Sequence, residues 1–261
     1  MHPSNAPLRP LGPTARQALA SRLGDTPETV ISVHLLRRGL ARAFVSGDLA
    51  DPIAAIIQAD ELPTEPAGFG EDATALWALL RRIDGWTCVN VSRSCARTLG
   101  DLISQERKTN IRLVGDVYHT LHQPVISFHH DAVRLLSPGD RPLLEAAPAA
   151  VRGGGFGSIE AMLADGITAG AVIDGILVAI AGTYARTAHH ADLGVTTLEP
   201  WRGHGFATAA ASLVCAELQR HGIRPVWSAG ERNGASLRIA RKLGFTEVGR
   251  RTYVIPDQAR P

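Results

Sequence analysis

Apolar and polar residues alternate in the first half of the chain with the periods of helices and strands. Apolar residues recur every three to four positions over residues 72–83, which predicts a helix. We expect strands over residues 86–91 and 111–117. Between them, Ser92 or Ser94 fits the N-cap of a helix that extends to about residue 108. This half therefore alternates helices and strands, and it contains no recognisable catalytic motif.

A second series of predicted strands and helices begins near residue 131. Asp174-Gly175 joins two apolar runs, and this dipeptide favours a tight hairpin because both positions tolerate a positive φ. Asp140 follows a Ser-Pro-Gly turn and fits the cap of a helix. The predicted strands cover residues 132–136, 168–173, 176–183, 191–197, 224–228 and 247–255, and the predicted helices cover residues 158–163, 205–222 and 233–243.

These patterns predict an α/β protein in two parts. Four prolines in residues 1–13 disfavour a helix and predict an extended, flexible arm over residues 1–14. We expect an N-terminal α/β domain over residues 15–130 and a second domain over residues 131–261. The two halves could each be a copy of one α/β unit, although the sequence signal for this is weak.

Composition narrows the class of protein without naming it. The 261 residues are 45% hydrophobic and 20% charged, enough for a sizeable core. The formal net charge is +2, aromatic residues make up 5%, and the sequence contains no basic stripe with interleaved aromatics, so we expect no nucleic-acid partner.

The cysteines and apolar stretches favour a cytoplasmic protein. Cys88, Cys95 and Cys215 lack the spacing of a zinc site or a disulfide framework, so we expect reduced structural thiols and no metal. The N-terminus has no signal-peptide pattern, and the most apolar stretch, residues 167–182, contains a charge and is too short for a membrane span.

The segment from Gly194 to Ala210 carries the clearest chemistry. A predicted strand leads into a glycine-containing turn, and this turn opens directly into a helix. The unpaired N–H groups and the dipole at a helix N-terminus form an anion site that suits a pyrophosphate. Gly203 and Gly205 would let the backbone approach the phosphates, and Arg202 adds a positive charge. A short glycine motif by itself is weak evidence, because a plain strand–turn–helix connection has the same pattern.

A second segment strengthens this interpretation. Arg202-Gly203-His204-Gly205-Phe206-Ala207 fits the Q/R-x-x-G-x-G/A motif, and Asn233-x-x-Ser236 leads to Lys242-Leu243-Gly244-Phe245. With this separation, the two segments resemble the GCN5-related N-acetyltransferase (GNAT) superfamily over roughly residues 131–255. The resemblance implies a GNAT fold, a mixed and largely antiparallel sheet flanked by helices, in the C-terminal half. It is closest to a subgroup whose N-terminal half is a smaller, degenerate GNAT-like α/β domain.

The resemblance also implies site residues for acetyl-CoA as co-substrate. Backbone groups of Val195, Thr196 and Thr197 would hold the acetyl carbonyl and the pantetheine arm. Asn233 and Ser236 would contact the pantetheine or the adenosine end. The strand containing Gly194 would diverge from its neighbour and open a slot for the thioester. The pyrophosphate would lie on the turn formed by Arg202, Gly203, His204, Gly205, Phe206, Ala207 and Thr208.

The catalytic groups are less defined. Deprotonating an amine of pKa about 10.4 at neutral pH costs roughly 4 kcal/mol, so a general base is useful. The position that holds a Glu in histone-type relatives is His189, beside His190, although a solvated strand end is the simpler reading of this pair. A tyrosine that protonates the thiolate in many relatives is replaced by Ala240. The thiolate would leave unassisted, or water, Tyr184 or Tyr253 would protonate it.

The sequence therefore predicts an N-acetyltransferase that moves an acetyl group from acetyl-CoA to an amine of a small molecule or protein by direct attack. The alternatives are a transferase for longer acyl-CoAs and a sensor that binds acyl-CoA without turnover. The N-terminal half would either shape the acceptor pocket or form a homodimer contact. We expect no membrane partner.

Overall fold

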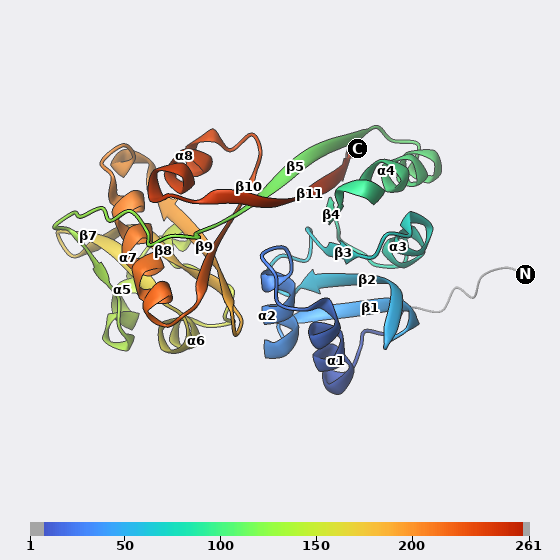
Figure 1. Cartoon of the computed structure of the whole chain (residues 1–261), viewed down its shortest axis with the longest axis horizontal. Helices are drawn as coiled ribbons and strands as arrows, with labels where there is room; N and C mark the ends of the chain where they lie inside the picture. Colours follow the sequence, from blue (N-terminus) through green and yellow to red (C-terminus); the bar gives the residue numbers. More distant parts are fainter. Residues whose placement is uncertain (1–7, 258–261) are drawn as a thin grey trace, which may run out of the picture. The chain divides into compact units, whose positions relative to one another are not determined.

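The computed structural model describes residues 8–257, and Figure 1 shows their helices and strands in chain order. Residues 8–24, Leu35–Asp116 and residues 250–257 form one compact unit. Asp25–His34 and Val117–Gly249 form the other. The predicted domain ranges 1–14, 15–130 and 131–261 stay predictions.

Three elements begin in one unit and end in the other. They are helix α2 (Val30–Arg38) and strands β5 (Ile111–Thr120) and β11 (Thr246–Pro256). Each unit therefore combines chain segments that are distant in sequence. Local sequence patterns could not predict which segments belong to the same unit.

The first unit places strands in the order β1-β2-β3-β4-β11. Pairing is antiparallel at β1/β2, β2/β3 and β4/β11, and parallel at β3/β4. Leu76, Leu80, Leu99 and Ile103 from two helices are fully buried in its core. The strands other than β11 are β1 (Ala41–Asp48), β2 (Asp51–Ala59), β3 (Ala67–Phe69) and β4 (Val89–Ser92), and the helices are α1 (Pro13–Leu23), α3 (Ala73–Leu80) and α4 (Arg93–Arg107).

A buried arginine ties three strands of this unit together. Arg251 on β11 donates through Nε to Asn90 Oδ1 on β4 at 2.5 Å and through Nη2 to the carbonyl of Gly68 on β3 at 2.5 Å. Its guanidinium also lies 4.5 Å from the ring centroid of Phe69. These bonds satisfy a charge that would be costly to bury alone.

The second unit places strands in the order β10-β9-β8-β7-β6. The pairs from β6 to β9 are antiparallel, and β9/β10 is parallel. Helices α5 (Arg141–Ala146), α6 (Ile159–Asp165), α7 (Phe206–Arg220) and α8 (Gly234–Leu243) accompany strands β6 (Val133–Leu135), β7 (Thr168–Ile173), β8 (Ile176–Arg186), β9 (His190–Thr197) and β10 (Arg224–Gly230), with short 3-10 turns at Pro138–Asp140, Ala149–Val151 and Glu199–Trp201.

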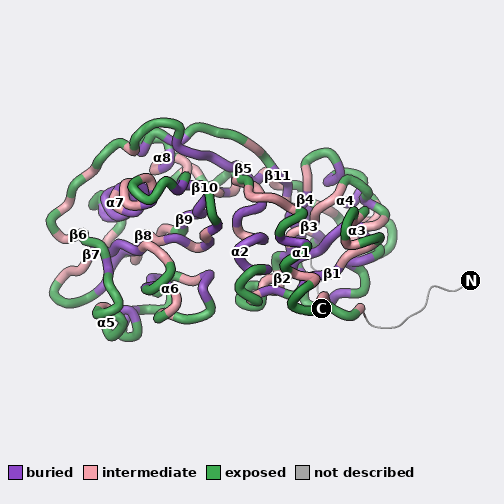
Figure 2. Tube along the Cα trace, turned by 60° about the horizontal axis from the view of Figure 1, so that its bottom comes forward, coloured by how far each residue is buried: buried purple, intermediate pink, exposed green. Residues whose placement is uncertain are grey.

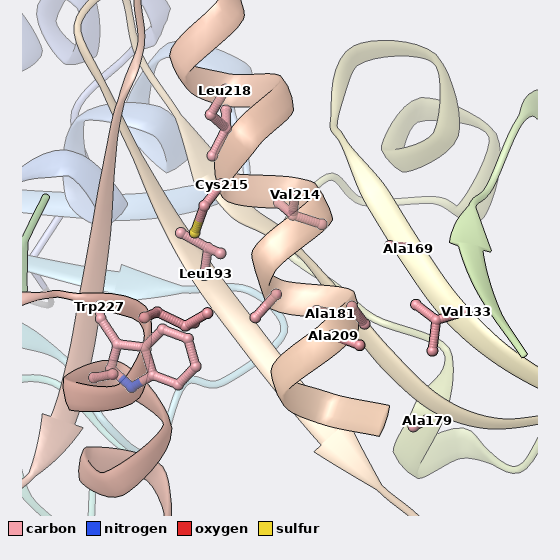
Figure 3. Close-up of a cluster of buried hydrophobic side chains, with 14 of the residues drawn as sticks. Val133, Ala169, Ala179, Ala181, Leu193, Ala209, Val214, Cys215, Leu218 and Trp227 are labelled. Carbon is pink, nitrogen blue, oxygen red and sulfur yellow. The ribbon is translucent and has the colours of Figure 1, made fainter. Parts of the chain in front are cut away.

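Helix α7 covers one face of this sheet. Its inner side carries alanines, Val214, Cys215 and Leu218, and the small side chains let the helix lie close to the strands. Figure 3 shows Cys215 and Leu218 turned toward Leu193 of β9, and Figure 2 shows buried residues along α7. Burying a side chain such as Val214 or Leu218 contributes about 1.5–3 kcal/mol.

The opposite side of the sheet is covered by α5, α6 and the loop between them. Leu144, Met162 and Phe156 pack there against Leu177 and Ile180 of β8. The site strands therefore rest on a rigid double-sided layer.

Most elements predicted after residue 72 are confirmed. The turn at Asp174-Gly175 has positive φ at both residues, 49° and 78°, as the hairpin signal required. Asp140 is the N-cap residue of α5 as predicted, but its side chain makes no capping bond, because the carboxylate accepts from Ser137 N and pairs with Arg134. The elements between residues 13 and 69 were not predicted individually.

A glycine in the loop before α6 fixes that loop. Gly155 has φ of +88°, and a Cβ there would overlap the carbonyl oxygen of Tyr184. The Nε2 of buried His34 donates to the Gly155 carbonyl at 2.8 Å, and its Nδ1 accepts from Arg186 N at 3.1 Å. The centre of the loop of residues 153–157 is therefore held in place by a hydrogen bond and by close packing.

Replacing this glycine tests the packing. We expect Gly155→Ala to lower the free energy of unfolding by roughly 3 kcal/mol, because it adds both steric overlap and an unfavourable φ. Gly175→Ala is the matched control, since its φ is +78° and a Cβ there would meet nothing within 4 Å. The control should lose about 1 kcal/mol in urea denaturation. Equal losses in the two variants would contradict the overlap.

Candidate functional site

The candidate site begins where two parallel strands separate. β9 and β10 pair through Arg224–His190, Pro225–Ala191 and Val226–Asp192. β9 continues to Thr197 and β10 continues to Gly230, but along these described stretches the pairing between them ends at Asp192 and Val226. Backbone groups of the diverging stretches are therefore available to a ligand, as parallel-sheet partners would otherwise occupy them.

The turn after β9 prepares a helix N-terminus. Glu199–Trp201 forms one 3-10 turn, and Gly203 and Gly205 then adopt positive φ of 87° and 84°. Gly205 is the N-cap residue of α7, and no side chain caps this helix. The first N–H groups of α7 consequently face outward with the positive end of the helix dipole.

Helix α8 forms the opposite wall. The Asn233 side chain caps it by accepting from Ser236 N at 3.1 Å, and Ser236 Oγ accepts from Trp227 Nε1 at 2.9 Å. These bonds fix α8 against β10. Arg238 and Lys242, four residues apart, lie on one side of the helix, and both line the cavity described next.

These elements enclose a cavity of about 720 Å³. Its lining contains three cationic side chains, Arg202, Arg238 and Lys242, and no carboxylate. The residues that line it are Val195, Thr196, Thr197, Trp201, Arg202, Gly203, Gly205, Phe206, Ala207, Thr208, Trp227, Asn233, Ala235, Ser236, Arg238, Ile239 and Lys242. Two motifs that are distant in sequence therefore line one cavity, and the charges of its lining favour an anion.

Eleven of the twelve residues predicted for the cofactor line this cavity; His204 does not. The His204 ring lies over Phe206 at a centroid distance of 5.6 Å, and its Nδ1 lies 3.1 Å from the carbonyl oxygen of Arg202. Arg238 and Lys242 were not predicted. The sequence could have indicated both residues, because their spacing from the helix start at Asn233 places them about one and two turns into the predicted helix.

The two predicted catalytic histidines lie at the other end of β9. His190 is buried, and its Nδ1 lies 2.8 Å from Asp25 Oδ1. Exposed His189 donates its backbone N–H to Asp25 Oδ2 at 3.0 Å, and Thr187 Oγ1 donates to Oδ1 at 2.7 Å. Neither histidine lines the 720 Å³ cavity. They line a separate groove with Asp25, and their catalytic role stays a prediction.

The tyrosines and cysteines are placed as follows. Tyr184 is on β8, on the strand next to β9, and stays a predicted acid. Tyr253 belongs to the first unit, where burial raises its pKa. Ala240 is fully buried in α8. Cys88, Cys95 and Cys215 are free and buried as predicted, and burial raises the pKa of Cys88 to about 11.

An acidic residue near the strand separation was missed. Asp192, on β9, is 3% exposed, and its Oδ1 accepts from Ser228 Oγ on β10 at 2.8 Å. The signal was an aspartate between Ala191 and Leu193 in a predicted strand, since a buried aspartate seldom occurs without a partner. The pair lies at the point where β9 and β10 part.

Comparison with known proteins places this architecture. Residues 151–254 match the family model of the GNAT acetyltransferases, so this part of the chain resembles the GCN5-related N-acetyltransferases. No curated protein matches the sequence. The fold class is confirmed: the second unit has the predicted mixed, largely antiparallel sheet with flanking helices.

Solved structures resemble the chain over nearly its whole length. A GCN5-related N-acetyltransferase-like protein from Streptococcus suis is 20% identical, with TM-score 0.68, and the match covers 94% of this chain and 100% of that one. A GCN5-related N-acetyltransferase from Kribbella flavida is 15% identical, with TM-score 0.61 and coverage of 96% and 97%. A tandem GNAT protein from the clavulanic acid biosynthesis pathway is 17% identical, with TM-score 0.54 and coverage of 96% and 95%.

The described residues lack both a membrane-spanning helix and a cluster of metal-ligating side chains. Residues 8–257 contain no helix with the length and apolarity that crossing a membrane requires. The same range contains no cluster of three or more His, Cys, Asp or Glu side chains arranged for a metal ion.

The Asp25 cluster yields a prediction of stability. Burial raises the pKa of Asp25, but hydrogen bonds from Thr187, His190 and His189 outweigh burial and hold the pKa below its ordinary value. The ionised carboxylate therefore stabilises the fold above the pKa it has when unfolded, and this contribution is lost as pH falls through the lower folded value. We expect Asp25→Asn to cost about 1–3 kcal/mol at pH 7 and progressively less in acid.

Urea denaturation of both proteins at several pH values measures this difference. Asp51→Asn is the control, because its ion pair with Arg22 is exposed. A cost of Asp25→Asn that stays constant into acid would contradict the role of its charge.

Proposed function

We propose that this protein is an acetyl-CoA-dependent N-acetyltransferase whose cofactor lies in the 720 Å³ cavity. The carrying observation is that two distant motifs line one cavity that contains Arg202, Arg238 and Lys242 and no acidic side chain. A CoA molecule carries several phosphate charges, and such a lining complements them.

The parts of the cavity correspond to the parts of the co-substrate. The N-terminus of α7, with Gly203 and Gly205, would receive the pyrophosphate, because its outward N–H groups meet phosphate oxygens without a Cβ between them. Val195, Thr196 and Thr197 lie along the separated stretch of β9, and their backbone would hold the pantetheine arm and the acetyl carbonyl. A backbone N–H near Thr197 would stabilise the oxyanion.

The reaction is direct attack of an amine on the thioester. Holding both reactants between β9 and β10 makes the attack effectively unimolecular, and a base that accepts the amine proton lowers the remaining barrier. His189, His190 and Tyr184 remain candidates for proton transfer. Ala240 supplies no acid, so the alternative of a non-catalytic acyl-CoA sensor is kept as an outcome of the test.

The test is calorimetric titration with acetyl-CoA. We expect saturable binding to the unchanged protein and at least a tenfold higher Kd, about 1.4 kcal/mol, for Gly205→Glu, which puts a carboxylate at the phosphates. Gly175→Glu is the matched control, because this glycine also has positive φ and open space but lies in the β7–β8 turn. Equal affinities in the two variants would place the site elsewhere.

Turnover separates the alternatives. Thiol release from acetyl-CoA in the presence of an amine supports the transferase. Tighter binding and faster release with a longer acyl-CoA would favour that substrate. Binding without release under any of these conditions would favour the sensor.

A further inference from the structure

We infer that Asp192 and Ser228 form a proton relay that receives an acceptor carrying a primary ammonium group. This inference rests on the proposed function, because it concerns the second substrate of the same site. It follows from the face of the sheet on which the pair lies, the exposure of its two members and the open space beside it.

The pair lies on the face of the sheet away from α7. Side chains alternate along a strand, and Leu193 and Trp227, which neighbour Asp192 and Ser228 in sequence, pack in the core beneath α7. The cross-strand partners of Asp192 are Ala185 and Val226, which belong to a different buried cluster with Val30 and Tyr118. Asp192 and Ser228 therefore face the side opposite the helix.

The two members differ in access. Asp192 is 3% exposed, whereas Ser228 is half-buried, and the Ser228 hydroxyl donates to Asp192 at 2.8 Å. We therefore place the incoming ligand at the Ser228 hydroxyl, with the carboxylate of Asp192 behind it. The bond holds the Asp192 carboxylate directly behind the Ser228 hydroxyl, where an ionised carboxylate would attract a cation.

The sheet surface beside the Asp192–Ser228 pair is free of a side chain at Gly194. Gly194 is two residues beyond Asp192 on the same face and is exposed. A Cβ built on it would meet a single neighbour, Tyr184 Cβ at 4.0 Å. The absent side chain thus leaves the sheet surface open at the place where β9 and β10 have already separated.

The relay completes the reaction with balanced protons. An ammonium group bound at Ser228 gives one proton to the Ser228 oxygen while the Ser228 hydroxyl proton passes to Asp192. The neutral amine then attacks the thioester carbonyl, so that a C–N bond forms and the C–S bond breaks. The second amine proton ends on the departing thiolate, giving an amide and a free thiol. Ser228 is the residue that touches the acceptor, and Asp192 acts through it.

The experiment uses the full-length protein, acetyl-CoA and n-butylamine as a minimal acceptor. We expect Asp192→Asn and Ser228→Ala to bind acetyl-CoA with unchanged Kd while the kcat for thiol release falls by about 100-fold or more. Ser228→Thr retains a hydroxyl and should recover most of the rate. Ser104→Ala is the control, because it removes a hydroxyl whose bond to the Thr109 carbonyl lies in the first unit.

Equilibrium binding gives a readout that is independent of turnover. With CoA bound, the protein should bind n-butylammonium at least tenfold more tightly than neutral n-butanol, and Asp192→Asn should abolish this preference. Near-normal kcat in Asp192→Asn, or failure of Ser228→Thr to exceed Ser228→Ala, would overturn the relay. Normal acetyl-CoA binding without n-butylamine turnover in the unchanged protein would overturn the acceptor class. Loss of acetyl-CoA binding in the unchanged protein would instead overturn the proposed function.

Discussion

The early end of pairing between β9 and β10 is the constraint on which the site depends. After Asp192 and Val226, two neighbouring strands of a parallel pair forgo the hydrogen bonds that would have joined them. Packing keeps the strands in place. Helix α7 packs against Leu193 and Trp227, and Trp227 also donates a hydrogen bond to Ser236 of α8. A gap that would be unstable in an isolated sheet is therefore held open by its surroundings.

The same separation divides the chemistry between two faces. Anion-binding features gather around the start of α7 and one side of α8, with Arg202, Arg238 and Lys242 in one lining. The buried carboxylate of Asp192 lies on the other face. In the proposed reaction, the cationic lining would attract the polyanionic donor, and Asp192 would attract a cationic acceptor from the other face.

Local sequence was informative where a residue has a local structural reason. Asp174-Gly175 predicted a hairpin, and Gly205 and Asn233 predicted helix starts, because turns and caps are determined by neighbouring residues. The cavity lining also followed from the motifs. The partners of His190 and His34 could not be predicted, because Asp25 and Gly155 lie 165 and 121 positions away and tertiary folding alone brings them together. Asp140 makes no capping bond for a local reason, because the neighbouring residues Arg134 and Ser137 engage its carboxylate.

Each of the two units contains a segment from the far end of the chain, and this limits where the protein can be cut into independent fragments. Because Asp25–His34 belongs to the second unit and the residues after Arg250 belong to the first, no single cut yields two complete pieces. Proteolytic cleavage near residue 130 would put Asp25 and His190 on different fragments, although the two side chains are hydrogen-bonded in the fold. Each half would then lack a segment of its own unit that the other half carries.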